Sequence, residues 1–231
     1  MWIRNMRSNH KGIKAKKINR YRTFMAVYAI ITIPIFTILF ATKQSPFQYT
    51  LSQIGNYFDW DHRKDFIIWG IVTGGGFAVY LTHLFNKAYF QNKKGRTWLI
   101  LSNLFLVLTV ITPSIKDVFP FFTRLHFIYS GLFAISLVLS TTFFIEYLGQ
   151  INAEITTKSI TWGLVVIGGS VLSLLIFGKT GIFEIFFLVT FSIYLIVLGL
   201  WMKNDEKIQA FIKDMHEKAE ESIDVIKGRL K

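Results

Sequence analysis

Hydrophobic and polar positions fall in long blocks along this chain. Six runs of 18 to 21 residues contain no Lys, Arg, Asp or Glu, and charged residues bound each of them. A transmembrane helix needs about 20 apolar residues to cross the roughly 30 Å hydrocarbon core of a bilayer. The pattern therefore predicts six transmembrane helices, at 23–42, 66–85, 97–115, 125–145, 159–178 and 185–202.

Two other folds would bury apolar residues in a different pattern. The helices of a soluble bundle would carry Lys and Glu on one face at every turn, and these runs have no such face. The strands of a membrane β-barrel would alternate apolar and polar residues over about ten positions. With 52% hydrophobic residues and 23 Phe in 231 positions, the sequence predicts an all-α, polytopic membrane protein.

The charges predict which way the helices run. The formal net charge is +12, and 20 of the 26 Lys and Arg residues lie in the N-terminal segment, the second-to-third loop, the fourth-to-fifth loop and the C-terminal segment. Cytoplasmic segments carry such an excess, so both termini are expected in the cytoplasm. The expected organisation is a basic cytoplasmic tail (1–22), a six-helix domain (23–202) and a cytoplasmic segment (203–231). The basic tail is interpreted as binding anionic lipid head groups, not nucleic acid.

The last segment, 203–231, changes character. Apolar residues recur at helical spacing between Lys and Glu pairs, which predicts an amphipathic helix. Such a helix could lie on the inner membrane surface or pair with a helix of a membrane protein partner. The surface interpretation is favoured, because about three heptads are marginal for a coiled coil.

Polar residues gather near the helix ends that should face outward. Candidate binding residues are Asp65, Arg124 and Tyr129. Ser52, His126 and Asp117 could form a catalytic set of nucleophile, base and orienting acid, although Ser52 lacks a G-x-S-x-G turn. In the alternative interpretation, Asp117, Arg124 and His126 form an interfacial network that caps helices and orders the loop.

Metal and cofactor chemistry finds little support in the sequence. There is no Cys, so thiolate ligands and a cysteine nucleophile are excluded. His62 and His126 with nearby carboxylates could bind zinc, but no H-x-x-x-H or H-E-x-x-H spacing is present. We therefore predict no metal site and no cofactor.

Two short segments resemble a known family. Residues 51–55 (LSQIG) resemble its S-x-L-G element, and residues 112–117 (TPSIKD) followed by 125–127 (LHF) are similar to its proline and aspartate before a histidine. The family is a bacterial group of uncharacterised six-helix membrane proteins, allied to the DRAM and FGF-receptor-activating-protein-like proteins, some of which are associated with lipid or GPI-anchor handling. The resemblance implies a bacterial cytoplasmic membrane and functional roles for Ser52, Asp117 and His126.

These observations favour one function and leave two others open. The first is binding of a lipid head group or membrane partner in an outward-facing polar pocket. The second is a membrane-embedded hydrolase or acyltransferase acting on lipid through Ser52, His126 and Asp117. The third is a small transporter, which the lack of a mid-membrane charge pair disfavours.

Overall fold

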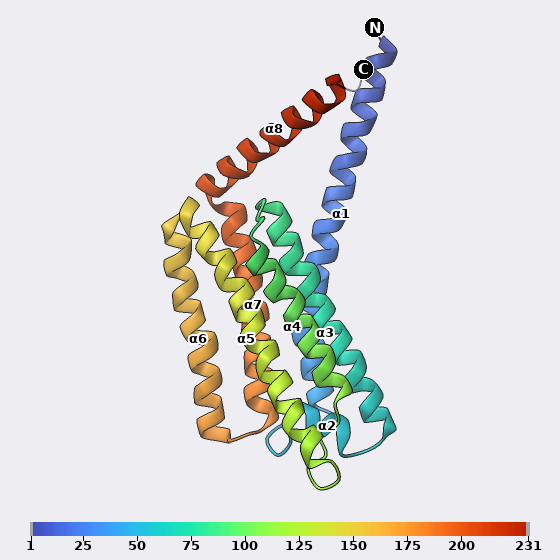
Figure 1. Cartoon of the computed structure of the whole chain (residues 1–231), viewed down its shortest axis with the longest axis vertical. Coiled ribbons are helices and arrows are strands. Elements are labelled where there is room, and N and C mark those ends of the chain that lie inside the picture. The colour runs from blue at the N-terminus through green and yellow to red at the C-terminus, as the bar shows by residue number, and fades with distance from the viewer. Residues whose placement is uncertain (1, 230–231) are drawn as a thin grey trace.

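The computed structural model describes residues 2–229, and the side chains of residues 20–221. This part of the chain is all-α and contains no strand (Figure 1). Its helices are α1 (Trp2–Ala41), α2 (Leu51–Asn56), α3 (Trp60–Lys87), α4 (Lys93–Ile111), α5 (Pro120–Ile151), α6 (Ala153–Phe177), α7 (Gly181–Asn204) and α8 (Glu206–Arg229).

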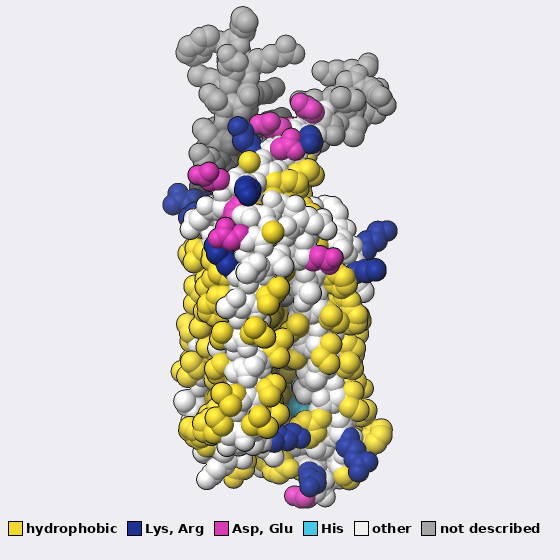
Figure 2. Space-filling model, turned by 90° about the vertical axis from the view of Figure 1, so that its left-hand side faces the viewer, with side chains coloured by type: hydrophobic (Ala, Val, Ile, Leu, Met, Phe, Trp, Pro, Cys, Tyr) yellow, Lys and Arg dark blue, Asp and Glu magenta, His cyan; other side chains and the backbone are white. Residues whose placement is uncertain are grey.

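Six of these helices are long and apolar enough to cross a membrane, as predicted. The spans are Arg20–Ala41 of α1 and the whole of α3, α4, α5, α6 and α7. Large apolar side chains cover their outer surfaces, including Ile71, Ile100 and Leu175, each more than 65% exposed. Figure 2 shows this apolar belt between two charged ends. A surface of this kind suits lipid, so the chain is a multi-pass membrane protein.

The six spans pack in a closed circuit. Each span contacts the next one around a ring. The contacting pairs are α1–α3, α3–α4, α4–α5, α5–α6, α6–α7 and α7–α1. Aromatic rings fill the middle, where Phe77 of α3 lies 5.7 Å from Phe191 of α7 and 6.4 Å from Phe133 of α5 between ring centroids. These rings therefore form part of the buried core between the spans.

Helix boundaries differ from the predicted runs for local reasons. α3 begins six residues before position 66 because the Asp59 carboxylate accepts a hydrogen bond from the backbone N–H of His62 at 2.8 Å. α4 ends at Ile111, short of position 115, because Pro113 disfavours helical backbone at the residue before it. Pro120 stands at the start of α5, where it has no N–H to leave unpaired.

Two helical segments were not predicted. α1 begins at Trp2, so the segment 1–22, expected as a tail, is helical from that residue. The short helix α2 lies in the loop between α1 and α3, and a capping box of Thr50 and Gln53 starts it. Helix α2 carries Ser52, one of the predicted site residues.

The two ends of the bundle are distinct (Figure 1). The α2 end contains α2 and the loops 112–119 and 178–180, and the α8 end contains the start of α1, the loop 88–92, the α5–α6 junction and α8. The predicted cytoplasmic segments therefore share the α8 end. Their cytoplasmic orientation stays a prediction.

Helix α8 occupies the segment expected to be amphipathic. Asp205 caps it by accepting a hydrogen bond from the backbone N–H of Ile208 at 3.0 Å. Ile208 is fully buried, and Ile212 packs on the same core. The first turns of the apolar face therefore meet the bundle, and α8 then extends away from it (Figure 1).

Candidate functional site

Helix α2 is attached to the start of α7. The Glu184 carboxylate of α7 accepts a hydrogen bond from the backbone N–H of Leu51 at 2.7 Å. The backbone N–H of Gly181 donates to the carbonyl oxygen of Tyr49 at 2.8 Å. A Cβ atom at position 181 would lie 2.8 Å from that same oxygen, so glycine is needed for this approach. These contacts hold Ser52, which is 3% exposed, beside α7.

His126 is fixed by the end of α4. Its Nδ1–H donates to the carbonyl oxygen of Thr112 at 3.1 Å, and its ring lies 6.4 Å from the ring of Phe66. Thr112 is the C-terminal cap of α4, where helix geometry leaves carbonyl groups without intrahelical partners. The imidazole satisfies one of these groups and is 2% exposed.

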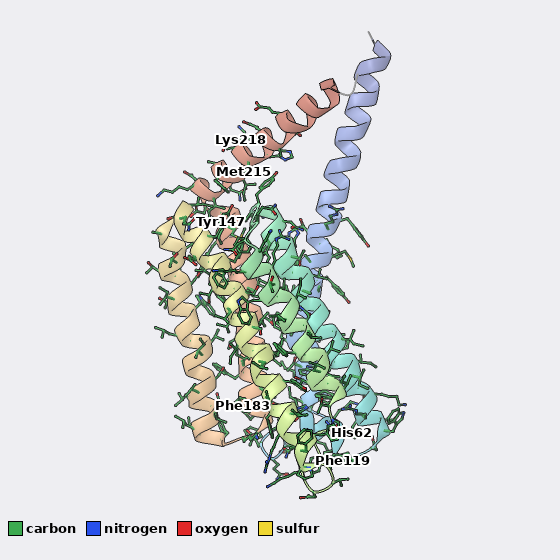
Figure 3. The ribbon with its side chains drawn as sticks, viewed as in Figure 1. His62, Phe119, Tyr147, Phe183, Met215 and Lys218 are labelled. Carbon is green, nitrogen blue, oxygen red and sulfur yellow. The ribbon has the colours of Figure 1, made fainter. Side chains whose placement is uncertain are left out.

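Ser52, His126 and Glu184 line one cavity of about 330 Å³. Its remaining lining is mostly apolar and comes from α2 to α7: Leu51, Phe66, Trp69, Leu106, Thr109, Ser130, Gly131, Phe133, Ala134, Ser170, Val171, Leu174, Phe183, Phe187 and Leu188. Figure 3 marks the lining residue Phe183 near the α2 end. An apolar cavity of this size with a few polar groups is typical of small-molecule sites.

Of the predicted catalytic set, the structure brings two members to the cavity. Ser52 and His126 line it, whereas Asp117 lies exposed in the loop 112–119 and does not. The Ser52 hydroxyl is 3.0 Å from the Thr50 hydroxyl, and the described residues include no hydrogen bond between Ser52 and His126. In a catalytic set, the carboxylate of Asp117 would accept a hydrogen bond from Nδ1 of His126. Here that nitrogen donates to the backbone carbonyl of Thr112 instead.

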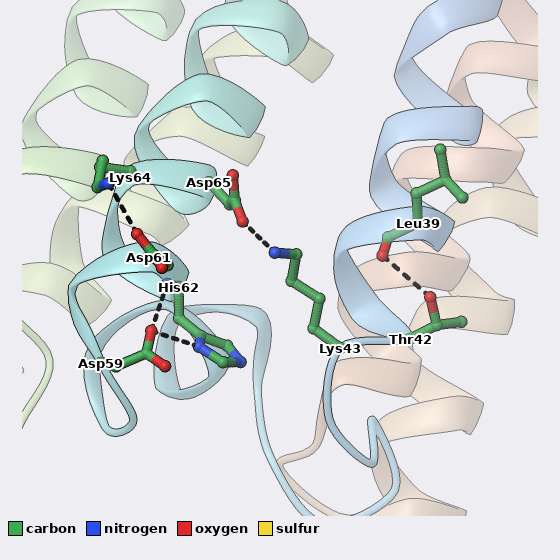
Figure 4. A network of polar contacts seen from close by, with 8 residues as sticks. All are labelled: Leu39, Thr42, Lys43, Asp59, Asp61, His62, Lys64 and Asp65. Atoms are coloured by element: carbon green, nitrogen blue, oxygen red, sulfur yellow. Dashed lines mark hydrogen bonds and ion pairs between the residues drawn. The ribbon is translucent and has the colours of Figure 1, made fainter.

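The predicted binding residues lie around the α2 end but outside the cavity. Asp65 forms an ion pair with Lys43, which joins the start of α3 to the end of α1 (Figure 4). Arg124 is exposed and Tyr129 is half-buried, and neither lines the cavity. His126 bonds to neither Asp117 nor Arg124 within the described residues, and its hydrogen bond goes to the backbone carbonyl of Thr112 instead.

His62 has a structural role at the start of α3. Its Nδ1 lies 2.7 Å from the Asp59 carboxylate, and the hydrogen bond from its backbone N–H lowers the pKa of Asp59 (Figure 4). Among the residues whose side chains are described, no three His, Asp or Glu gather in a group that could hold a metal ion.

Two cationic groups, Arg63 and Lys179, lie close enough to act electrostatically on His126 in the cavity wall. Arg63 donates to the Asn56 side chain at 2.8 Å and to the carbonyl of Ile111 at 3.0 Å. Lys179 lies over the ring of Phe127, and burial lowers the pKa of its ammonium while the charge of Glu184 opposes that shift. Figure 2, seen from the α6 side, shows a histidine in a hollow with Lys or Arg side chains close by.

Sequence reasoning missed the part that Glu184 plays. Its carboxylate contacts Leu51, which is 133 positions away in the chain, so the pairing has no local signal. The available signal is weaker: Glu184 is the acidic residue in the first turn of a strongly apolar helix, where a charged group usually has a function.

No protein-family model, curated protein or solved structure matches this chain. The fold and the cavity therefore rest on the contacts of the chain itself. The resemblance of residues 51–55 and 112–127 to the six-helix bacterial family stays a prediction.

Proposed function

We propose that the protein binds a membrane lipid at the α2 end. The acyl chain occupies the apolar part of the cavity, and the polar head group meets Ser52, His126 and Glu184. The observation that supports this most strongly is the composition of the lining, where the Ser52 hydroxyl, an imidazole and a carboxylate join a mostly apolar wall. Arg63 and Lys179 nearby favour a head group that carries a phosphate.

The seam between α5 and α6 supplies a route from the bilayer. Only 11% of the most apolar 18 residues of α6 are buried, against 33% to 50% for the other five spans. A Cβ atom added at Gly131 of α5, which lines the first cavity, or at Gly163 of α6, which lines a second one, would have no neighbour within 4 Å. This second cavity, of about 560 Å³, lies further along the same seam. An acyl chain can therefore enter sideways without crossing a charged surface.

The charge distribution favours the outer leaflet as the source of this lipid. Because cytoplasmic loops carry most Lys and Arg residues, the α2 end is expected outside the cytoplasm. We place the protein in a bacterial cytoplasmic membrane on the resemblance described above.

The test compares two glycine substitutions. Gly131→Phe fills the cavity, whereas Gly75→Phe puts the same ring on the lipid-facing side of α3, where a Cβ also meets nothing within 4 Å. The purified full chain is supplied with phosphatidylethanolamine, and bound lipid is counted by native mass spectrometry. Gly131→Phe should remove one tightly bound lipid that Gly75→Phe retains. Equal lipid counts in both variants would rule out the cavity as the site.

A second candidate function is hydrolysis or transfer of a lipid acyl group. It is favoured by one observation, the presence of Ser52 and His126 in the same cavity. With its Nδ1 proton on the Thr112 carbonyl, a neutral His126 carries its basic lone pair on Nε2. That nitrogen would take the Ser52 proton as the oxygen attacks an ester carbonyl, and would return it to the alcohol that leaves when the ester C–O bond breaks and the acyl group stays on Ser52. A fluorophosphonate probe should then label the native chain and not Ser52→Ala. An unlabelled, folded native chain would eliminate this function.

A further inference from the structure

A larger groove lies at the opposite end of the bundle. It has a volume of about 1130 Å³ and lies between α1, α3 and α8. Its lining comprises Tyr21, Arg22, Thr23, Met25, Ala26, Ala78, Val79, Thr82, His83, Asn86, Lys87, Tyr89, Gln209, Ile212, Lys213 and His216. We propose that this groove binds the phosphoryl head group of an anionic phospholipid.

The charges of the groove are of one sign. Arg22 of α1, Lys87 of α3 and Lys213 of α8 bring three cations from three separate helices, and among the described side chains no Asp or Glu lines the groove. Within residues 20–221, Arg22 and Lys87 form no ion pair, and Lys213 reaches Glu217 only at 3.9 Å. The charge of Lys203 also acts on Lys87. The three cations therefore create a local positive potential that attracts an anion to the groove.

Apolar residues share the same lining, which distinguishes a lipid from a free anion. Met25, Val79 and Ile212 lie among the cations, and Met25 and Val79 are exposed. The groove also lies where two spans reach the end of their apolar stretch, at Arg20 and at Lys87. Phospholipid phosphates lie at that level of a bilayer, and each nearby Lys or Arg contributes about 1 kcal/mol of attraction to them.

Helix α8 forms one wall of the groove and is held in place by specific contacts. The Tyr89 hydroxyl lies 3.0 Å from Nδ1 of His216, which joins α8 to the loop after α3. Asp205 caps the helix and accepts a hydrogen bond from the Asn152 side chain at 2.5 Å. The groove is therefore a built feature of the α8 end, independent of the cavity at the α2 end.

The experiment neutralises the three cations together. The full chain is purified in a neutral detergent and titrated with dioleoyl phosphatidylglycerol or dioleoyl phosphatidylcholine, with bound lipid measured by native mass spectrometry. The test variant is Arg22→Gln, Lys87→Gln, Lys213→Gln. The matched control is Lys93→Gln, Lys94→Gln, Lys158→Gln, which removes equal charge from the same end outside the groove. Circular dichroism confirms that both are folded.

The native chain should prefer phosphatidylglycerol, and the test variant should weaken that binding by about tenfold or more, while the control changes it by less than about threefold. Inorganic phosphate, added as a competitor, should not displace the lipid. The proposal is overturned by equal binding of the two lipids, by equal losses in the two variants, or by displacement with inorganic phosphate. The last result would identify a site for a soluble phosphate.

Discussion

The two sides of α5 differ sharply in how they are packed. Toward α4, the side chain of Ser140 donates to the backbone carbonyl of Gly95 at 2.8 Å, and the rings of Phe85, Phe90 and Phe144 lie 4.8 to 5.3 Å apart. Toward α6, a Cβ atom at Gly131 or Gly163 would meet nothing within 4 Å, and two cavities follow the seam. The two helices approach closely near their junction, where a Cβ atom at Gly149 would clash with the Thr156 side chain. The tight side fixes the position of α5, and the open side leaves room beside α6 for a molecule from the bilayer.

Small residues occur on both sides, so glycine content does not explain the difference. A Cβ at Gly95 would lie 2.7 Å from the ring of Phe90, whereas Gly131 and Gly163 have nothing within 4 Å. In lipid, apolar surface gives no net drive for helices to associate, and packing must supply it. The helices pack closely where an aromatic ring fills the space beside a glycine. A cavity remains where no side chain fills that space.

The largest effect is expected from the tight side. Phe144→Ala removes a fully buried ring that packs on Phe85 and Phe90. We expect a loss of about 2–3 kcal/mol, because the cavity costs energy although lipid removes part of the hydrophobic term. The measurement is the free energy of unfolding in mixed micelles titrated with dodecyl sulfate. Leu164→Ala on the exposed face of α6 is the control, and an equal loss there would contradict the contrast.

The next effect concerns the wall of the cavity that α7 provides. Glu184→Ala leaves the Leu51 N–H without its acceptor, which should cost about 1–2 kcal/mol. Glu184→Gln keeps an oxygen acceptor and should lose less. Hydrogen exchange of the Leu51 and Ser52 amides reports the change. If exchange is the same in both variants, Glu184 does not hold α2.

A smaller effect is expected where the seam closes, at the α5–α6 junction. Asp205→Ala removes the N-cap of α8. It also removes the hydrogen-bond partner of Asn152, the residue that caps α6, and we expect the free energy of unfolding to fall by about 1 kcal/mol. The control is Asp205→Asn, which retains capping ability. Faster proteolysis of α8 in the alanine variant alone is the expected readout.

The same contact predicts a dependence on pH. The backbone N–H of Ile208 lowers the pKa of Asp205, so the carboxylate stabilises the native state above its unfolded pKa of about 3.9. That contribution is lost as the pH falls through the lower folded value. Protection of α8 in the native chain should therefore decrease below about pH 4 more than in Asp205→Asn. Identical acid profiles would contradict this account.

The smallest effect is expected from glycine-to-alanine substitutions, one on each side of α5. Gly163→Ala enters open space beside the second cavity and reduces the freedom of the unfolded chain, so it should stabilise the protein by about 0.5 kcal/mol. Gly95→Ala meets the ring of Phe90 and should destabilise it. The two thermal midpoints should move in opposite directions. A common direction would mean that the seam is as tightly packed as the α4 side.

The sequence allowed the spans to be predicted because each is a signal about 20 residues long. The short helix α2 was missed, since six residues in a polar loop give no such signal and depend on a cap at Thr50. Ser52 and His126 were chosen by residue type, and the sequence could not predict their shared cavity. That depends on the closed circuit of spans and on the contact of Glu184 with Leu51, which join distant parts of the chain.

The central claim is that a lipid chain enters between α5 and α6. A phospholipid with a photoactivatable diazirine in its acyl chain, reconstituted with the full protein and irradiated, tests this most directly. The account predicts crosslinks on residues 130–134 of α5 and 170–174 of α6, which are lost in Gly131→Phe and kept in Gly75→Phe. Crosslinks spread evenly over the exposed faces of all six spans, and unchanged by Gly131→Phe, would contradict it.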